Sequence, residues 1–185
     1  ADELMAAARA QMDPESAGWY DGTIVSPNSR WLIHPEEFPE GRDYRFRVVC
    51  PEGVSFVSGV HRSGGIYRAP ADPLGQTPRA AFGNFSLAQI QVPGGMVELI
   101  YQKGGLTIED AQMVAWGRTR VESVADYFGK FPVDRAVVAA LPSDRRGTRG
   151  IAMGNGGASV VFLVPRTMPA AQLRISWELT HELIH

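Results

Sequence analysis

Two histidines at the end of the sequence, His181 and His185, constrain the fold more than any other feature. They are four positions apart, and Glu182 directly follows the first of them. In an α-helix, residues four positions apart lie one turn above each other on the same face. The spacing therefore predicts a helix that directs both imidazoles towards one point, with Glu182 about 100° further round the axis.

The residue types in this pattern point to metal chemistry. The pattern His-Glu-x-x-His is typical of zinc peptidases, in which both imidazoles bind the ion and the carboxylate takes a proton from a zinc-bound water. We therefore predict His181 and His185 as zinc ligands and Glu182 as the general base. A catalytic zinc ion usually takes three protein ligands. Because the chain as given ends on His185, we expect it to lack the third ligand and to be inactive by itself.

The residues that precede the two histidines favour one continuous helix. Pro169 fits a first helical turn, and the residues from Ala170 to Arg174 are good helix formers. Apolar side chains recur on two sides of this segment, namely Ile175, Leu179 and Leu183 on one and Leu173, Trp177 and Ile184 on the other. We therefore predict a largely buried helix. Two core or solvated histidines on an ordinary helix are the weaker alternative.

The segment around these histidines resembles a known peptidase family. Residues 177–185 read Trp-Glu-Leu-Thr-His-Glu-Leu-Ile-His, and a glycine-rich stretch from Gly154 to Phe162 precedes them. Both are similar to the glycyl aminopeptidase-like branch of the gluzincin zinc peptidases, as is Tyr127–Pro132 with the apolar residues after it. The resemblance covers residues 82–185. It implies that a glutamate beyond His185 completes the zinc shell and that a later tyrosine assists the oxyanion.

The glycine-rich stretch is a candidate substrate site. It lacks the Gly-Lys-Ser/Thr ending of a phosphate-binding loop and precedes a strand instead of a helix. The resemblance implies that Gly154, Asn155, Gly156 and Gly157 lie beside an extended substrate backbone, where the absence of side chains permits a close approach. A flexible turn between two strands remains an equally good interpretation of these residues.

Alternation of apolar and polar residues predicts strands in the first part of the chain. Tyr44, Phe46 and Val48 alternate with arginines, and residues 88–92 and 97–101 alternate on either side of Pro93-Gly94-Gly95, which predicts a hairpin. With a short leading helix over residues 2–11, these strands define a predicted β-rich domain, residues 1–104.

The second predicted domain, residues 105–185, contains helices and apolar strands. A helix capped by Thr107 ends at Gly129, and apolar runs at 136–141 and 158–164 predict central strands. The predicted fold class is α+β. An antiparallel, sandwich-like β-rich domain precedes the N-terminal part of a thermolysin-like zinc-peptidase domain made of a helix, a mixed sheet and the ligand helix.

Composition restricts the partners of the chain. Its net charge of −2 gives no reason to expect nucleic acid, and no apolar run is long enough to cross a bilayer. A single cysteine, Cys50, excludes an internal disulfide and a cysteine-based zinc site. Such a chain fits either the cytosol or the periplasm, and we expect a periplasmic or secreted location.

The arginine cluster Arg145, Arg146 and Arg149 is the one local concentration of charge. It fits a solvated loop better than an electrostatic guide for a substrate carboxylate.

Together these features predict zinc-dependent hydrolysis of peptide bonds, with peptides or proteins as substrates and an aminopeptidase-like mode of action. The alternative is a noncatalytic binding or scaffold module that carries a vestigial motif. The oligomeric state cannot be predicted from the sequence.

Overall fold

The computed structural model describes residues 17–34, 42–70 and 76–185, and these form two compact units. One unit comprises the chain up to Asn84 together with Met153–Ser159; the other comprises Phe85–Ala152 and Val160–His185. The hairpin predicted at residues 88–101 belongs to the second unit. The domain limits 1–104 and 105–185 remain a prediction, and the predicted helix over residues 2–11 lies outside the described residues.

The first unit is built from short antiparallel strands. One sheet has the order β1 (Gly18–Tyr20), β2 (Thr23–Ser26), β7 (Ala80–Gly83) and β4 (Ser55–Ser58), with the 3-10 helix η1 (Asn28–Arg30) after β2. A second sheet has the order β3 (Asp43–Phe46), β6 (Ile66–Pro70) and β5 (His61–Ser63). In and after β3, Tyr44, Phe46 and Val48 are half-buried, whereas Arg45 and Arg47 are exposed, which confirms the predicted alternation.

Aromatic side chains join the two sheets of the first unit. Trp31 makes edge contacts with Phe46 of β3 and with Phe56 and Phe82 of β4 and β7, at ring-centroid distances of 5.4, 5.9 and 4.9 Å. Tyr67 of β6 stacks on Phe46 at 5.1 Å. Burial of such rings supplies much of the core of a small β-rich unit. Tyr67 is buried, and the half-buried Phe46 and Phe56 pack against the cluster that it forms with Val60 and Ala69.

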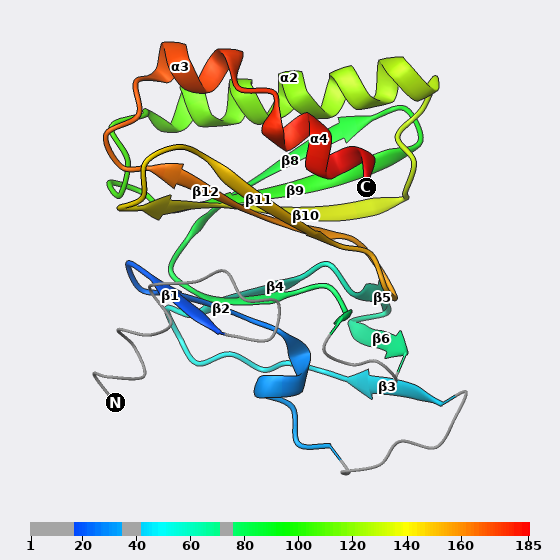
Figure 1. Cartoon of the computed structure of the whole chain (residues 1–185). Helices are drawn as coiled ribbons and strands as arrows, with labels where there is room; N and C mark the ends of the chain where they lie inside the picture. The colour runs from blue at the N-terminus through cyan, green and yellow to red at the C-terminus, as the bar shows by residue number, and fades with distance from the viewer. Residues whose placement is uncertain (1–16, 35–41, 71–75) are drawn as a thin grey trace. The chain divides into compact units, whose positions relative to one another are not determined.

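The second unit is a mixed five-stranded sheet covered by helices. The strand order is β11 (Arg149–Met153), β12 (Ser159–Pro165), β10 (Arg135–Ser143), β9 (Gly95–Tyr101) and β8 (Ser86–Val92). β8 and β9 form the predicted antiparallel hairpin, whereas β10 pairs in parallel with β9 through the crossover helix α2 (Asp110–Phe128). The helices α2, α3 (Ala170–Ile175) and α4 (Glu178–Ile184) all lie on one face of this sheet (Figure 1). The predicted α+β class is therefore confirmed.

The start of α2 differs from the prediction, whereas its end agrees. Glu109, not Thr107, is the N-cap, and its backbone N–H donates to the side chain of Gln112 at 3.1 Å. The Thr107 hydroxyl instead donates to the Met168 carbonyl at 3.0 Å. Thr107 is the better N-cap residue by type, but its hydroxyl is used in this tertiary contact and the helix begins after Glu109. Gly129, with φ of 77°, ends the helix as expected.

The predicted continuous helix from Pro169 to His185 is wrong. Ser176 is extended, with φ −67° and ψ 128°, and separates α3 from α4. In one straight helix, Leu173 and Leu179 would point about 120° apart, so both could not face the sheet. The break lets Leu173, Leu179 and Leu183 all be buried. Ile175, Trp177 and Ile184, which we expected to be buried, are 77%, 62% and 51% exposed.

No helix among the described residues is long and apolar enough to cross a membrane.

Close backbone packing at Gly59 gives a first prediction. A Cβ at this position would lie 2.1 Å from the Ala158 carbonyl oxygen, and that carbonyl cannot move freely because it belongs to the backbone. Gly59→Ala should therefore lower the free energy of unfolding by about 2 kcal/mol or more. Gly154→Ala is the matched control, because a Cβ there meets nothing within 4 Å. Urea denaturation followed by tryptophan fluorescence measures both, and equal effects would contradict the packing argument.

Candidate metal centre

The two predicted zinc ligands converge on one point at the end of α4. The Nε2 atoms of His181 and His185 are 3.0 Å apart, and both side chains are exposed. Two nitrogens bound to one zinc ion at 2.0–2.1 Å in a tetrahedral shell lie about 3.3 Å apart. The two rings, with centroids 4.6 Å apart, therefore need only a small adjustment to share an ion. The imidazole pair fits zinc as two of its ligands.

Trp177 restricts one side of this pair. Its ring makes an edge contact with the His181 ring, with centroids 5.4 Å apart and an angle of 86° between the ring planes. Trp177 occupies the position before α4 and remains 62% exposed. An indole packed against a ligand imidazole limits the rotation of that ring.

A third protein ligand is absent from the described part of the chain. Residues 17–34, 42–70 and 76–185 contain no group of three or more His, Cys, Asp or Glu side chains that could hold a metal ion. Glu178 is the nearest carboxylate on the N-terminal side of His181, but it is engaged elsewhere. Its Oε1 accepts a hydrogen bond from the Thr148 hydroxyl at 2.9 Å. The described residues therefore supply two ligands of a shell that usually has three.

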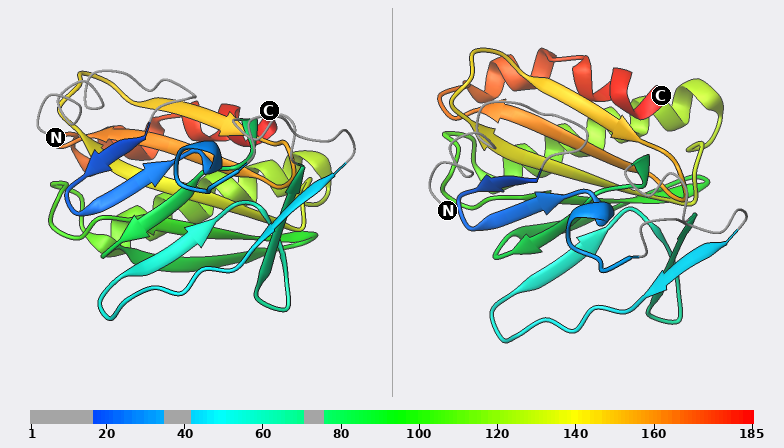
Figure 2. Two further views of the ribbon diagram at one scale, coloured as in Figure 1. Left: turned by 90° about the horizontal axis from the view of Figure 1, so that it is seen from below. Right: turned by 60° about the horizontal axis from the view of Figure 1, so that its bottom comes forward.

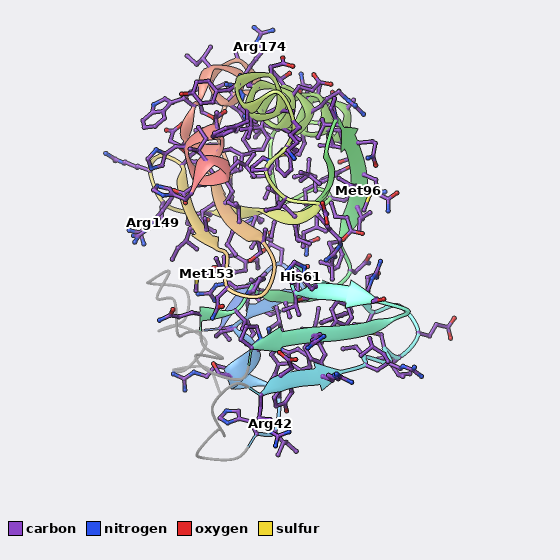
Figure 3. The ribbon with its side chains drawn as sticks, turned by 90° about the vertical axis from the view of Figure 1, so that its right-hand side faces the viewer. Arg42, His61, Met96, Arg149, Met153 and Arg174 are labelled. Carbon is purple, nitrogen blue, oxygen red and sulfur yellow. The ribbon has the colours of Figure 1, made fainter. Side chains whose placement is uncertain are left out.

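Glu182 lies against the edge strand β11. A Cβ at Gly150 would be 2.2 Å from the Glu182 Cγ and 2.7 Å from its Cδ, so the carboxylate occupies space that any other residue at position 150 would fill. Figure 2 shows α4 alongside β11, and Figure 3 labels Arg149 and Met153 at the two ends of this strand. Gly150 thus places the predicted general base beside the main chain of an edge strand.

The contact between α4 and the start of β11 has two parts. Glu178 and Glu182 are four positions apart on α4, and they meet Thr148 and Gly150 respectively. The second oxygen of Glu178, Oε2, is buried without a hydrogen-bond partner. Sequence reasoning missed Thr148 and Gly150 as parts of this site. A glycine inside a strand often marks the close approach of another group, and this signal could have identified Gly150.

The predicted substrate residues lie in the turn between β11 and β12, which belongs to the first unit. The Gly156 carbonyl accepts a hydrogen bond from the His61 N–H at 3.0 Å, and Gly157 forms an antiparallel bridge with Val60. A Cβ at Gly156 would lie 2.3 Å from Pro70 Cδ. Gly154 is exposed, and Asn155 is half-buried. Packing within the first unit accounts for two of these glycines, and their role in substrate binding remains a prediction.

The fold resembles that of part of an aminopeptidase N family protein. The aminopeptidase N family protein from Idiomarina loihiensis aligns with a TM-score of 0.67 and 16% sequence identity, over 94% of this chain and 32% of that chain. The chain shares the fold of about a third of that protein. A variant of an M1 zinc metallopeptidase from Deinococcus radiodurans aligns with a TM-score of 0.49 and 16% identity, over 94% of this chain and 42% of its own. No family model and no curated protein matches the sequence.

The two-ligand geometry predicts weak zinc binding by these 185 residues. Two imidazoles leave half of the usual shell to water, so we expect a dissociation constant in the micromolar range or higher. His181→Ala should abolish the binding, whereas His61→Ala, an exposed histidine on β5, should leave it unchanged. Isothermal titration calorimetry measures each constant. Nanomolar affinity in the monomer would show that another residue completes the shell.

Proposed function

We propose that this chain carries the ligand helix and the general base of a zinc-dependent peptidase, which hydrolyses peptide bonds in an aminopeptidase-like manner. The observation that carries the proposal is the convergence of the His181 and His185 Nε2 atoms, with Glu182 one position after the first histidine and beside an edge strand. The likeness of the fold to an aminopeptidase N family protein supports it. Because the chain spans about a third of that protein, the activity belongs to a polypeptide that also supplies a third ligand.

Each residue has one task in this proposal. His181 and His185 would hold zinc, which when bound would lower the pKa of a coordinated water towards about 7. The Glu182 carboxylate accepts the proton of that water and later delivers it to the leaving amine. The packing of its side chain against Gly150 restricts the directions in which the carboxylate can point.

The edge strand β11 offers the main-chain groups that an extended peptide needs. β11 is the outermost strand of the described sheet, and its residues after Arg149 are only half-buried. A peptide can add to such an edge by main-chain hydrogen bonds, which bind a backbone irrespective of its side chains. We also propose, from the family resemblance, that Gly154, Asn155, Gly156 and Gly157 bind the backbone of the substrate.

Further features of the proposal follow from the sequence. The substrate is a peptide or protein, and the protein acts in the periplasm or outside the cell.

Replacement of the general base tests the proposal. In the full polypeptide that contains this chain, Glu182→Gln should abolish peptide hydrolysis and leave the zinc content unchanged, because an amide cannot accept the proton. His181→Ala should lose metal and activity together. Glu122→Gln is the matched control, because Glu122 is an exposed residue of α2. Activity is measured on a fluorogenic amino-acid amide and metal by atomic absorption. Near-normal turnover of Glu182→Gln would exclude the general-base role.

Substitution of Gly150 tests the positioning of that base. In the same polypeptide, Gly150→Ala should displace the Glu182 carboxylate and lower kcat by about a hundredfold, with little change in zinc content. Glu122→Gln, on the exposed surface of α2, serves as the control. If Gly150→Ala kept its kcat, the contact between Glu182 and β11 would have no part in catalysis.

A second candidate function is a noncatalytic binding or scaffold module that keeps a vestigial motif. The observation in its favour is that the described residues supply no third ligand. Under this alternative, the full polypeptide binds peptides equally well with and without zinc, and Glu182→Gln changes nothing. Turnover of the Glu182→Gln variant, together with peptide binding measured with and without zinc, therefore separates the two functions.

A further inference from the structure

A pocket between α2 and α3 lies in the second unit. It has a volume of about 380 Å³, within the usual range for sites that bind small molecules. No residue of α4 lines this pocket. Its lining comes from α2, α3 and the segment before α2, namely Ile108, Gln112, Ala115, Trp116, Thr119, Arg120, Ala170, Ala171, Leu173 and Arg174. The pocket is therefore distinct from the histidine pair.

Two residues that line this pocket have buried hydrogen-bond donors without partners. Trp116 is 4% exposed, and its indole Nε1 has no hydrogen-bond partner. The Arg120 Nε is likewise buried and unpartnered, although the same guanidinium donates from Nη2 to the Arg174 carbonyl at 3.0 Å. Buried donors are almost always satisfied in folded proteins, because leaving them unpaired costs free energy. Neither N–H group can accept a hydrogen bond, so a partner must present acceptor atoms.

The positive charge of the lining residues favours a ligand whose hydrogen-bond acceptor is negatively charged. Arg120 and Arg174 contribute two positive charges, and the ten lining residues include no aspartate or glutamate. Among the described residues, neither guanidinium forms an ion pair with a carboxylate of this chain. Arg174 lies on the helical side of the unit, where Figure 3 labels it. A carboxylate suits such a site, because guanidinium groups bind carboxylates through charge-assisted hydrogen bonds.

The remaining lining selects the rest of the ligand. Ile108, Ala115, Ala171 and Leu173 present aliphatic groups, and Trp116 packs against Phe162 with ring centroids 5.2 Å apart. A free amino acid would also bring an ammonium group, for which no lining carboxylate is present. We propose that this pocket binds a small aliphatic monocarboxylate, with the carboxylate held by Arg120 and Trp116 and the tail against the aliphatic lining.

Titration of the metal-free 185-residue protein with hexanoate tests the site, with acetate and hexylamine as comparators. Hexanoate should bind at least about tenfold more tightly than acetate, which lacks the tail, and than hexylamine, which carries the opposite charge. In ¹H–¹⁵N spectra, hexanoate should shift the indole signal of Trp116 and leave those of Trp19, Trp31 and Trp177 in place. Equal binding of hexylamine, no binding of hexanoate at millimolar concentration, or an unmoved Trp116 signal overturns the proposal.

Two substitutions localise the binding to the unpartnered donors. Trp116→Phe keeps an aromatic ring against Phe162 but removes the N–H, and Arg120→Lys keeps the charge but removes Nε. Each should weaken hexanoate binding by about tenfold. Arg118→Lys is the matched control, since Arg118 lies near Glu122 on the exposed side of α2. Hexanoate binding that is unchanged in both Trp116→Phe and Arg120→Lys overturns the assignment. The spectra of the unmodified protein provide the test should either variant fail to fold.

Discussion

The second unit depends on the parallel pairing of β9 with β10. Parallel neighbours cannot be joined by a tight turn, so the chain must cross over, and α2 is that crossover. The crossover works because α2 packs close to the sheet, where a Cβ at Gly117 would lie 2.7 Å from the Leu99 side chain. Once α2 covers this face, α3 and α4 pack beside it, and their short helices gain most of their stability from tertiary contacts.

The candidate site is formed by two elements that follow this pairing in the sequence. α4 brings both imidazoles and the carboxylate, whereas β11 brings the glycine against which the carboxylate lies. The Thr148–Glu178 hydrogen bond adds a contact between α4 and the residue just before β11. Rigid elements position reactive groups more precisely than loops do. The site therefore depends on the packing of α4 on the sheet edge and not only on the local pattern of two histidines and a glutamate.

Several elements could be predicted because a short-range pattern determines them. The alternation at Tyr44 and Phe46, the hairpin around Pro93, and the left-handed Gly129 all follow from local physics. The break at Ser176 could not be predicted, because burying Leu173 together with Leu179 is a tertiary requirement. The helical spacing of the histidines was predictable, whereas the contact of Glu182 with Gly150 joins residues far apart in the chain and leaves no mark in local periodicity.

The break at Ser176 leaves α4 as a helix of seven residues. An isolated helix of this length is marginal in water, so its order comes from Leu179, Leu183 and the two carboxylates beside β11. Ordering of the segment and capture of an ion by its two imidazoles are then thermodynamically linked: an ion that binds both rings stabilises the helical state, and fraying of the segment releases the ion. The metal affinity of this chain and the local stability of its last turns are one coupled equilibrium.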